Sequence, residues 1–324
     1  MNGIINVYKE QGYTSFDVVA KLRGILKQKK IGHTGTLDPD ACGVLPVCLG
    51  KATKVCELLT DKDKVYEAVL LLGRTTDTQD TTGQTQSTHE VTCTNEQVTD
   101  AVSHFIGDYD QIPPMYSALK VNGKKLCDLA RAGIEVERKS RRVHIFSIDI
   151  LDMELPRVKM RVHCSKGTYI RTLCQDIGEM LGCGGCMESL LRTRVADFDL
   201  EHAYRLSEIE EAVRNQTIAQ MIAPIDQVFL HYPALTVKAG YEKLLYNGNR
   251  MPEESILEQD VLAALKDAMA SKDAKAQEDA QTQKCARAAK DAWVRIYDAA
   301  GAFIGIYEYR KPQQELKPVK IFME

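Results

Sequence analysis

The 324-residue sequence lacks several features that identify common classes of protein. It has no run of about 18 apolar residues, which argues against a membrane-spanning helix. Its first residues, MNGIINVYKEQGYTSF, have neither the basic segment nor the apolar core of a signal peptide. These absences lead us to expect a cytoplasmic protein, and a hydrophobic content of 44% predicts an ordinary folded core.

Nucleotide-binding and hydrolytic motifs are also absent. The sequence contains no G-x-G-x-x-G, H-E-x-x-H or G-x-S-x-G. Six residues separate Gly43 from Gly50, and Ala52 stands where a phosphate-binding loop needs Ser or Thr. The sequence therefore shows no site for a nucleotide cofactor.

Residues that bind metals are sparse and dispersed. The seven histidines lie far apart, and the ten cysteines are scattered, mostly in apolar segments. Cys183 and Cys186 have the C-x-x-C spacing of two zinc ligands, but no second pair follows at a spacing that would complete four. Reduced, packed thiols are the better interpretation, and we expect no metal.

The net charge of −3 conceals a basic region. Thirteen Lys and Arg against six Asp and Glu between Ser117 and Arg171 give a local excess of +7. A basic region of this kind suits a phosphate-bearing partner such as nucleic acid. A solvated, charged surface has the same composition, so charge alone leaves both interpretations open.

Hydrophobic periodicity predicts an α/β protein with two regions. The predicted strands cover residues 3–8, 64–72, 141–152 and 157–165, and the predicted helices cover 16–28, 52–59, 94–106, 124–132, 169–181 and 208–214. Residues 29–51 and 74–88 are predicted as loops, and 187–197 as mixed structure. A boundary near residue 230 separates region 1–230 from a β-rich region, 231–324. Within the latter, residues 253–292 are rich in Ala, Asp, Lys and Gln, which predicts an exposed helical or partly disordered insertion.

One carboxylate, Asp38, stands out in the loop IGHTGTLDPD. Pro39 follows it and biases its backbone toward extended angles. A carboxylate in a stiff loop can act as a ligand, an acid or base, or a covalent nucleophile. A buried, ionised Asp needs a nearby cation, and Arg171 at the start of a predicted helix is the candidate. Capping a turn is the commoner use of a loop Asp, and locally it remains the favoured interpretation.

Four segments read together change this balance. In order along the chain they are IGHTGTLDPDACGVLPVCLGKATK, DKVYEAVLLLGRTTDTQDTTG, QIPPMYSALKVNGKKLCDLARAGIEVERKSRRV and CSKGTYIRTLCQDIGEMLG. They closely resemble the TruB family, the tRNA pseudouridine synthases that isomerise uridine 55 in the T-arm. The resemblance covers about residues 1–230.

The resemblance implies catalytic roles for three residues. Asp38 matches the family's catalytic nucleophile, and Arg171 matches the arginine that pairs with it. Tyr66 matches the tyrosine that stacks on the target base and is a candidate for taking the C5 proton.

The resemblance also implies a set of residues that bind the substrate. His33 matches the histidine that fills the T-loop in place of the flipped nucleotides, while Tyr169 and Leu190 line or bound the base pocket. Asp77 and Asp80 fall on a loop that borders the site in relatives. In addition, we expect Lys51, Lys120 and Lys124 to bind RNA.

The expected fold is of the α/β (α+β) type, with a mixed, largely antiparallel sheet and a small, β-rich, PUA-like C-terminal domain. Segment 114–142 corresponds to the part that closes over RNA in relatives. The implied reaction involves no redox change or hydrolysis, so we expect no cofactor. The implied partner is the T-arm of tRNA, bound by a monomer that needs no protein partner. Two alternatives remain open, namely another RNA substrate or guide-directed complex, and a module that remodels tRNA without chemistry.

Overall fold

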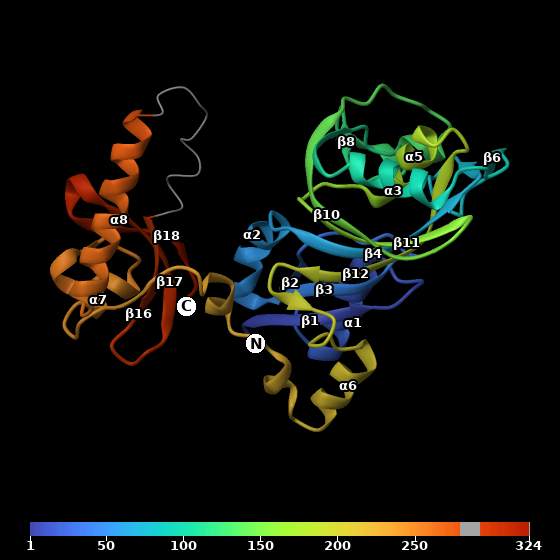
Figure 1. Cartoon of the computed structure of the whole chain (residues 1–324). Coiled ribbons are helices and arrows are strands. Elements are labelled where there is room, and N and C mark those ends of the chain that lie inside the picture. The colour runs from blue at the N-terminus through green and yellow to red at the C-terminus, as the bar shows by residue number, and fades with distance from the viewer. Residues whose placement is uncertain (279–291, 324) are drawn as a thin grey trace. The chain divides into compact units, whose positions relative to one another are not determined.

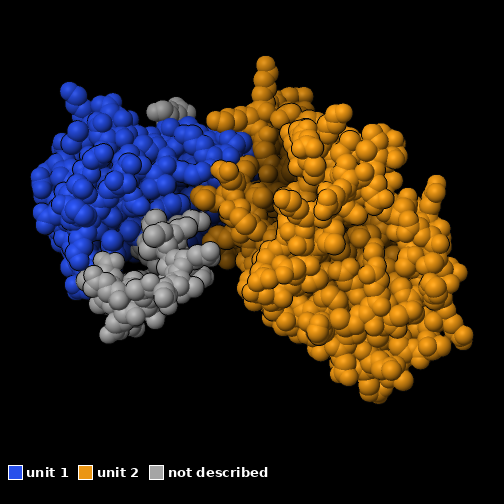
Figure 2. All heavy atoms as spheres, turned by 90° about the horizontal axis from the view of Figure 1, so that it is seen from above, with its two compact units in different colours: residues 1–4, 48–55, 222–324 blue, residues 5–47, 56–221 orange. Residues whose placement is uncertain are grey.

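The computed structural model describes residues 1–278 and 292–323, of which 270–278 by their backbone alone (Figure 1). The chain divides into two compact units (Figure 2). The larger unit contains residues 5–47 and 56–221, and the smaller unit contains residues 1–4, 48–55 and 222–324. The sequence placed one boundary near residue 230. The observed division lies between residues 221 and 222, and two N-terminal segments join the smaller unit.

A nine-stranded sheet dominates the first two thirds of the chain. Seven strands follow the order β1-β3-β12-β4-β11-β10-β7, while β2 pairs with β3 and β13 pairs with β12. Their bounds are β1 Gly3–Lys9, β2 Ile31–His33, β3 Cys42–Leu49, β4 Lys64–Leu72, β7 Gly107–Gln111, β10 Arg141–Glu154, β11 Arg157–Cys164, β12 Gly185–Val195 and β13 Phe198–Asp199. The β12–β3 pair is parallel, whereas β12–β4, β4–β11, β11–β10 and β10–β7 are antiparallel. This confirms the predicted mixed, largely antiparallel sheet.

Helices α3 and α5 cover one face of this sheet (Figure 1). The helices of the larger unit are α1 Ser15–Leu26, α2 Cys56–Thr60, α3 Asn95–His104, α4 Leu126–Arg131, α5 Ile170–Met180 and α6 Leu206–Arg214. Strict alternation of buried and half-buried residues along β4 turns Tyr66, Ala68 and Leu70 toward the helices. Tyr66 therefore lies on the face of the sheet that packs in the hydrophobic core.

Three stretches differ from the sequence-based expectation. Residues 42–49, predicted as loop, form β3, whose last seven residues are all buried. A strand buried on both faces shows a continuous apolar run and no alternation, so periodicity could not reveal it. The predicted loop 74–88 contains the paired strands β5 (Arg74–Thr76) and β6 (Thr85–Thr88). The mixed stretch 187–197 belongs mainly to β12, where register shifts interrupt the alternation.

Segment 114–142 carries little regular structure. It contains the two-residue strands β8 (Lys120–Val121) and β9 (Lys124–Lys125), followed by α4. Arg138 Nη1 donates to Pro113 O at 3.0 Å and so holds the end of the segment to its beginning.

The smaller unit contains a five-stranded sheet of order β14-β16-β17-β18-β15. Its elements are β14 Ala234–Thr236, α7 Glu242–Tyr246, β15 Met251–Pro252, α8 Gln259–Glu278, β16 Trp293–Tyr297, β17 Phe303–Arg310 and β18 Glu315–Ile321. The helix predicted in the 253–292 insertion is present as α8. One face of its first turns is buried, because Leu262 and Leu265 pack in the core of this unit, and much of the rest of these turns is exposed as expected. Residues 279–291 of the predicted insertion lie outside the described residues.

Candidate active site

Two adjoining cavities open on the larger unit, and Asp38 lines both. The first has a volume of about 570 Å³ and the second about 840 Å³. Both are also lined by Ser117, Arg171 and Leu190. Their sizes fall in the range of sites that hold a small ligand or part of a polymer. The shared wall around Asp38 is therefore the candidate centre of chemistry.

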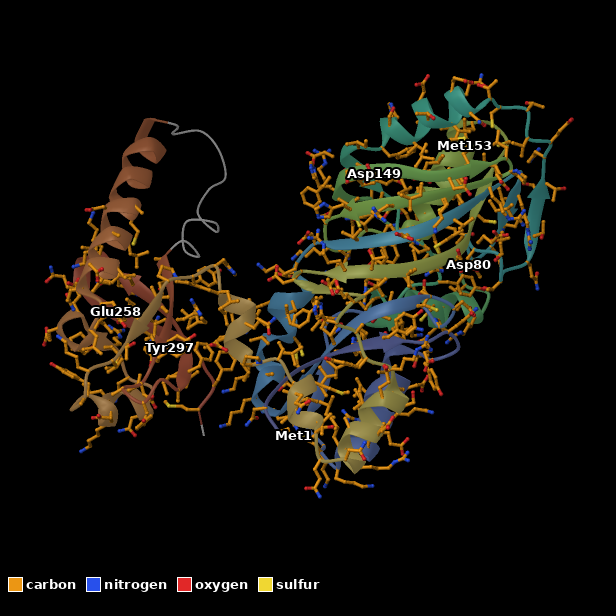
Figure 3. The ribbon with its side chains drawn as sticks, turned by 60° about the horizontal axis from the view of Figure 1, so that its bottom comes forward. Met1, Asp80, Asp149, Met153, Glu258 and Tyr297 are labelled. Atoms are coloured by element: carbon orange, nitrogen blue, oxygen red, sulfur yellow. The ribbon has the colours of Figure 1, made fainter. Side chains whose placement is uncertain are left out.

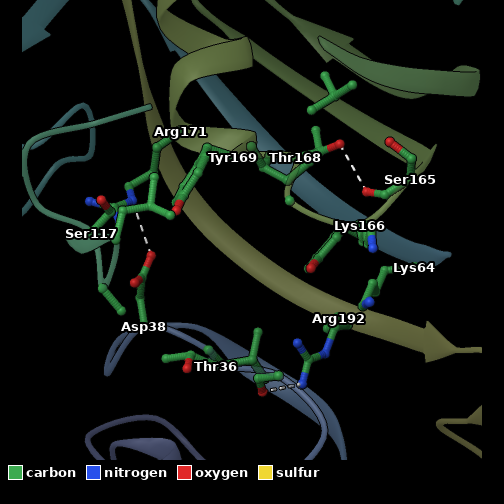
Figure 4. A pocket seen from close by; sticks show the side chains of 18 of the residues that line it. Thr36, Asp38, Lys64, Ser117, Ser165, Lys166, Thr168, Tyr169, Arg171 and Arg192 are labelled. Atoms are coloured by element: carbon green, nitrogen blue, oxygen red, sulfur yellow. Dashed lines mark hydrogen bonds and ion pairs between the residues drawn. The ribbon is translucent and has the colours of Figure 1, made fainter. Parts of the chain in front are cut away.

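Asp38 and Arg171 form an ion pair at this wall (Figure 4). Arg171 Nε lies 3.0 Å from Asp38 Oδ2. The Arg171 side chain is 6% exposed, whereas 40% of the Asp38 side chain faces open space. Protein around the carboxyl raises the pKa of Asp38, and the attraction of Arg171 opposes that rise without cancelling it. The carboxylate is thus accessible from the cavities and is oriented by Arg171, whose charge only partly offsets the effect of burial on its pKa.

A buried lysine stiffens the loop that carries Asp38. Lys9 is fully buried, and its ammonium donates to the carbonyl oxygens of Tyr13 at 2.6 Å and Pro39 at 3.0 Å. Pro39 O also accepts from Gly12 N at 2.9 Å. These bonds tie the residue after Asp38 to the end of β1. Sequence analysis gave no role to Lys9, because a lysine in a strand is usually solvated at its tip.

Arg171 occupies the first turn of α5 and binds three further groups. Its Nη1 lies 3.1 Å from Thr78 O and 3.7 Å from Asp80 Oδ2, and its Nη2 lies 2.8 Å from Tyr116 O. Asp80, labelled in Figure 3, belongs to the loop between β5 and β6. One guanidinium therefore joins the Asp38 loop, the β5–β6 loop and segment 114–142.

Asp77 is not part of this group, because its carboxylate instead accepts from Gln84 N at 2.7 Å. The sequence analysis placed both Asp77 and Asp80 on a loop that borders the site in relatives. Only Asp80 is brought to Arg171.

Tyr66 and Arg192 line the first cavity from neighbouring strands. Burial raises the pKa of Tyr66, and the adjacent Arg192 guanidinium opposes the rise. Arg192 is 1% exposed, and its Nε donates to Val44 O at 2.7 Å. The sequence analysis missed Arg192. The segment SLLRTRV alternates arginines with other residues, which is also the pattern of solvated arginines on a strand, so the sequence held no signal for a buried Arg192.

The first cavity is bordered by cations. Lys64, Arg141, Arg142 and Lys166 line it together with Arg192. Burial and the nearby Arg192 lower the pKa of Lys64 to about 8. Such a lining favours an anionic ligand such as a phosphodiester.

The other predicted binding residues are distributed unevenly. Tyr169 lines the first cavity and Leu190 lines both. His33 is half-buried at the end of β2, and its ring Nδ1 accepts from Gly35 N at 3.3 Å; it lines neither cavity. Lys120 and Lys124 are exposed on the β8–β9 pair, outside both cavities. Lys51 lies in residues 48–55, which belong to the smaller unit.

Within residues 1–278 and 292–323, no three His, Cys, Asp or Glu side chains are grouped to hold a metal ion. Cys183 and Cys186 are both buried and form no disulfide, and Cys183 packs in the apolar core. None of the helices in this part of the chain is long and apolar enough to cross a membrane.

Comparison with known folds and sequences identifies the class of protein. A chain in an H/ACA ribonucleoprotein bound to a substrate RNA containing 2′-deoxyuridine matches 99% of this chain and 85% of its own length, at 22% identity and a TM-score of 0.68. A chain in a Cbf5–Nop10–Gar1 complex matches equally well, at 24% identity. These likenesses concern the fold. The model of the TruB family pseudouridylate synthase N-terminal domain matches residues 23–170, which marks the chain as a pseudouridine synthase, an isomerase.

The family follows from two further findings. The model of the tRNA pseudouridylate synthase B C-terminal domain matches residues 171–229. The tRNA pseudouridine synthase B of Lachnoclostridium phytofermentans is 54% identical over all of both chains, and that of Clostridium kluyveri is 42% identical, again over all of both. The enzyme of Alkaliphilus oremlandii is 48% identical over 80% of this chain and 85% of its own. The chain belongs to the TruB family.

Proposed function

We propose that this protein isomerises uridine 55 in the T-arm of tRNA to pseudouridine, with Asp38 acting on a flipped-out uridine. The observation that carries the proposal is the Asp38–Arg171 ion pair where the two cavities meet. The relatives named tRNA pseudouridine synthase B support tRNA as the substrate. We also propose that the enzyme acts on tRNA as a monomer and needs no protein partner.

The reaction rearranges bonds without oxidation or hydrolysis. The C1′–N1 glycosidic bond breaks, the uracil rotates, C5 bonds to C1′, the proton on C5 leaves, and N1 takes up a proton, so that the product is an isomer of the substrate. A carboxylate must begin this sequence in its ionised form. Arg171 supplies the positive charge that holds Asp38 ionised and oriented. Asp38 then acts either at the uracil ring or at the sugar C1′, and both routes start from the same ion pair.

Tyr66 provides the surface for the extruded base. A uridine in a folded arm must leave its stack before it can react, and an aromatic side chain replaces the lost stacking. Burial raises the pKa of Tyr66, so its hydroxyl stays protonated near neutral pH. This favours the stacking role over removal of the C5 proton. We propose that Tyr169 and Leu190 enclose the base on the other sides.

We propose that the basic residues place the RNA backbone. The cations of the first cavity, together with Lys51, Lys120 and Lys124, would contact phosphates, and segment 114–142 would close over the bound arm. Because Arg171 binds Tyr116 O, closure of this segment and the orientation of Asp38 share one side chain. His33 would fill the space in the T-loop that the flipped nucleotides leave.

The domain roles follow the same division. Residues 1–230 would form the catalytic domain, and the β-rich region 231–324 would act as a PUA-like RNA-binding domain. The matched family models end at residue 229, so the second role rests on its β-rich architecture.

Tritium release from a T-arm stem-loop carrying [5-³H]uridine tests the proposal. Wild type should release tritium, and Asp38→Asn should lose roughly 10⁴-fold or more in rate while still binding the RNA. Substantial turnover by Asp38→Asn would remove the carboxylate from the chemistry. RNA binding without tritium release by wild type would instead indicate a remodelling module or another RNA substrate.

A further inference from the structure

One polar group in the active site has no hydrogen-bond partner. Among the described residues, five buried side-chain polar atoms have none, and Ser117 Oγ is the one that belongs to a residue lining both cavities. Ser117 is 6% exposed. It lies beside Asp38 and Arg171 at one end of the first cavity (Figure 4).

The backbone around Ser117 is held firmly. Ser117 N donates to Met115 O at 2.9 Å, and Ser117 O accepts from Cys127 N at 3.0 Å. The preceding carbonyl, Tyr116 O, is bound by Arg171 Nη2 at 2.8 Å. The side chain that orients Asp38 therefore also fixes the position of the Ser117 hydroxyl.

An unpaired buried hydroxyl is costly, since leaving such a group unsatisfied typically costs about 1–3 kcal/mol. Burial raises the pKa of the nearby Tyr169 phenol, and the Ser117 hydroxyl opposes that rise. The two groups nevertheless do not meet the geometry of a hydrogen bond. Each unsatisfied group in a native protein calls for an explanation, and a partner supplied by a bound ligand is one explanation. Ser117 lines both cavities, so this explanation applies to it.

Neighbouring donors are already engaged. Arg171 is occupied by Asp38, Asp80 and two carbonyl oxygens, and Arg192 donates to Val44 O. The Ser117 hydroxyl is therefore a neutral donor beside the carboxylate that no protein group engages. A uracil ring presents two carbonyl oxygens that can accept it.

We propose that the Ser117 hydroxyl donates a hydrogen bond to a carbonyl oxygen of the flipped uracil and so sets the base against Asp38. This inference rests on the proposed uridine isomerase function. It makes Ser117 a substrate-binding residue that the sequence analysis did not single out.

The test compares Ser117→Ala with a matched control. Tyr307→Phe also deletes a buried hydroxyl without a partner, but from the core of the smaller unit and outside both cavities. Neither variant loses a hydrogen bond within the protein, so neither should lower the melting temperature. Tritium release from the T-arm stem-loop should fall about 5- to 50-fold in kcat/KM for Ser117→Ala and stay at the wild-type value for Tyr307→Phe.

Further measurements separate the possible causes. Ser117→Thr, which keeps the hydroxyl, should recover part of the activity, and 2-thio or 4-thio substitution of the target uridine should make the loss on Ser117→Ala smaller for one of the two. The loss should also persist in a Tyr169→Phe background, since a hydroxyl acting through Tyr169 would have no effect there.

Wild-type kinetics for Ser117→Ala, or a lower melting temperature accompanying its loss of activity, would overturn the proposal. Because wild type is assayed on the same RNA, an inactive wild type would point to failure of the proposed function and not of this inference.

Discussion

Replacing Arg171 with Lys tests whether the geometry of the guanidinium, beyond its charge, supports the site. Three nitrogen atoms of Arg171 contact four groups: they form hydrogen bonds to Thr78 O and Tyr116 O and ion pairs with Asp38 and Asp80. The lysine side chain ends in a single ammonium, which cannot reach all four groups as the planar guanidinium does. If the lysine keeps Asp38 and one other partner, two of the four contacts are lost.

The size of the effect follows from these contacts. Hydrogen bonds that involve a charged group contribute about 1.5 kcal/mol or more each, so two lost contacts destabilise the larger unit by about 3 kcal/mol. For a domain of this size that corresponds to roughly 6–12 °C in melting temperature. Misplacing a catalytic group by about 1 Å costs on the order of 10²-fold in rate, and we expect a fall in kcat of that size.

The assay is single-turnover tritium release with saturating enzyme, alongside thermal unfolding. Arg205→Lys is the matched control, because Arg205 forms an exposed ion pair with Glu10 at 2.6 Å outside both cavities. Such a pair contributes little, so the control should behave as wild type. Wild-type kcat for Arg171→Lys would refute the argument that the fork positions Asp38.

Three further predictions follow. Because burial raises the pKa of Asp38 and the reaction needs the ionised form, kcat should fall on acidification at a pH above the ordinary carboxyl value of 3.8; a pH–rate profile without that acid limb would contradict this. Lys9→Met should lower the free energy of unfolding by about 2–4 kcal/mol in urea titrations, because buried carbonyl oxygens lose their donor, whereas exposed Lys21→Met should change it little. Since the pKa of Lys64 is lowered to about 8, its amine loses its charge above that pH, and affinity for T-arm RNA should drop between pH 7 and 9 in wild type more than in Lys64→Met.

Much of the larger unit could be predicted because its signals are local. The predicted strand 64–72 is present as β4, and the predicted helix 94–106 is present as α3, which begins at a capping box between Thr94 and Gln97. β3 could not be predicted in the same way, because burial on both faces removes the alternation that marks a strand. The helix expected within 253–292 is present and largely exposed over its first turns, but Leu262 and Leu265 bury one face that its thin apolar stripe did not predict.

By itself, the sequence determined the order of the family motifs, and with it the TruB family and the candidates Asp38, Tyr66 and Arg171. Only the tertiary structure decided which charged side chains surround them. Arg192 and Asp80 reach the site across sheet pairing and loop packing between segments far apart in the chain. Whether a side chain is buried, and whether its polar atoms find hydrogen-bond partners, likewise depends on how the chain packs. No local pattern distinguishes a solvated Ser117 or Lys9 from one enclosed by protein, so only the fold shows that both are buried.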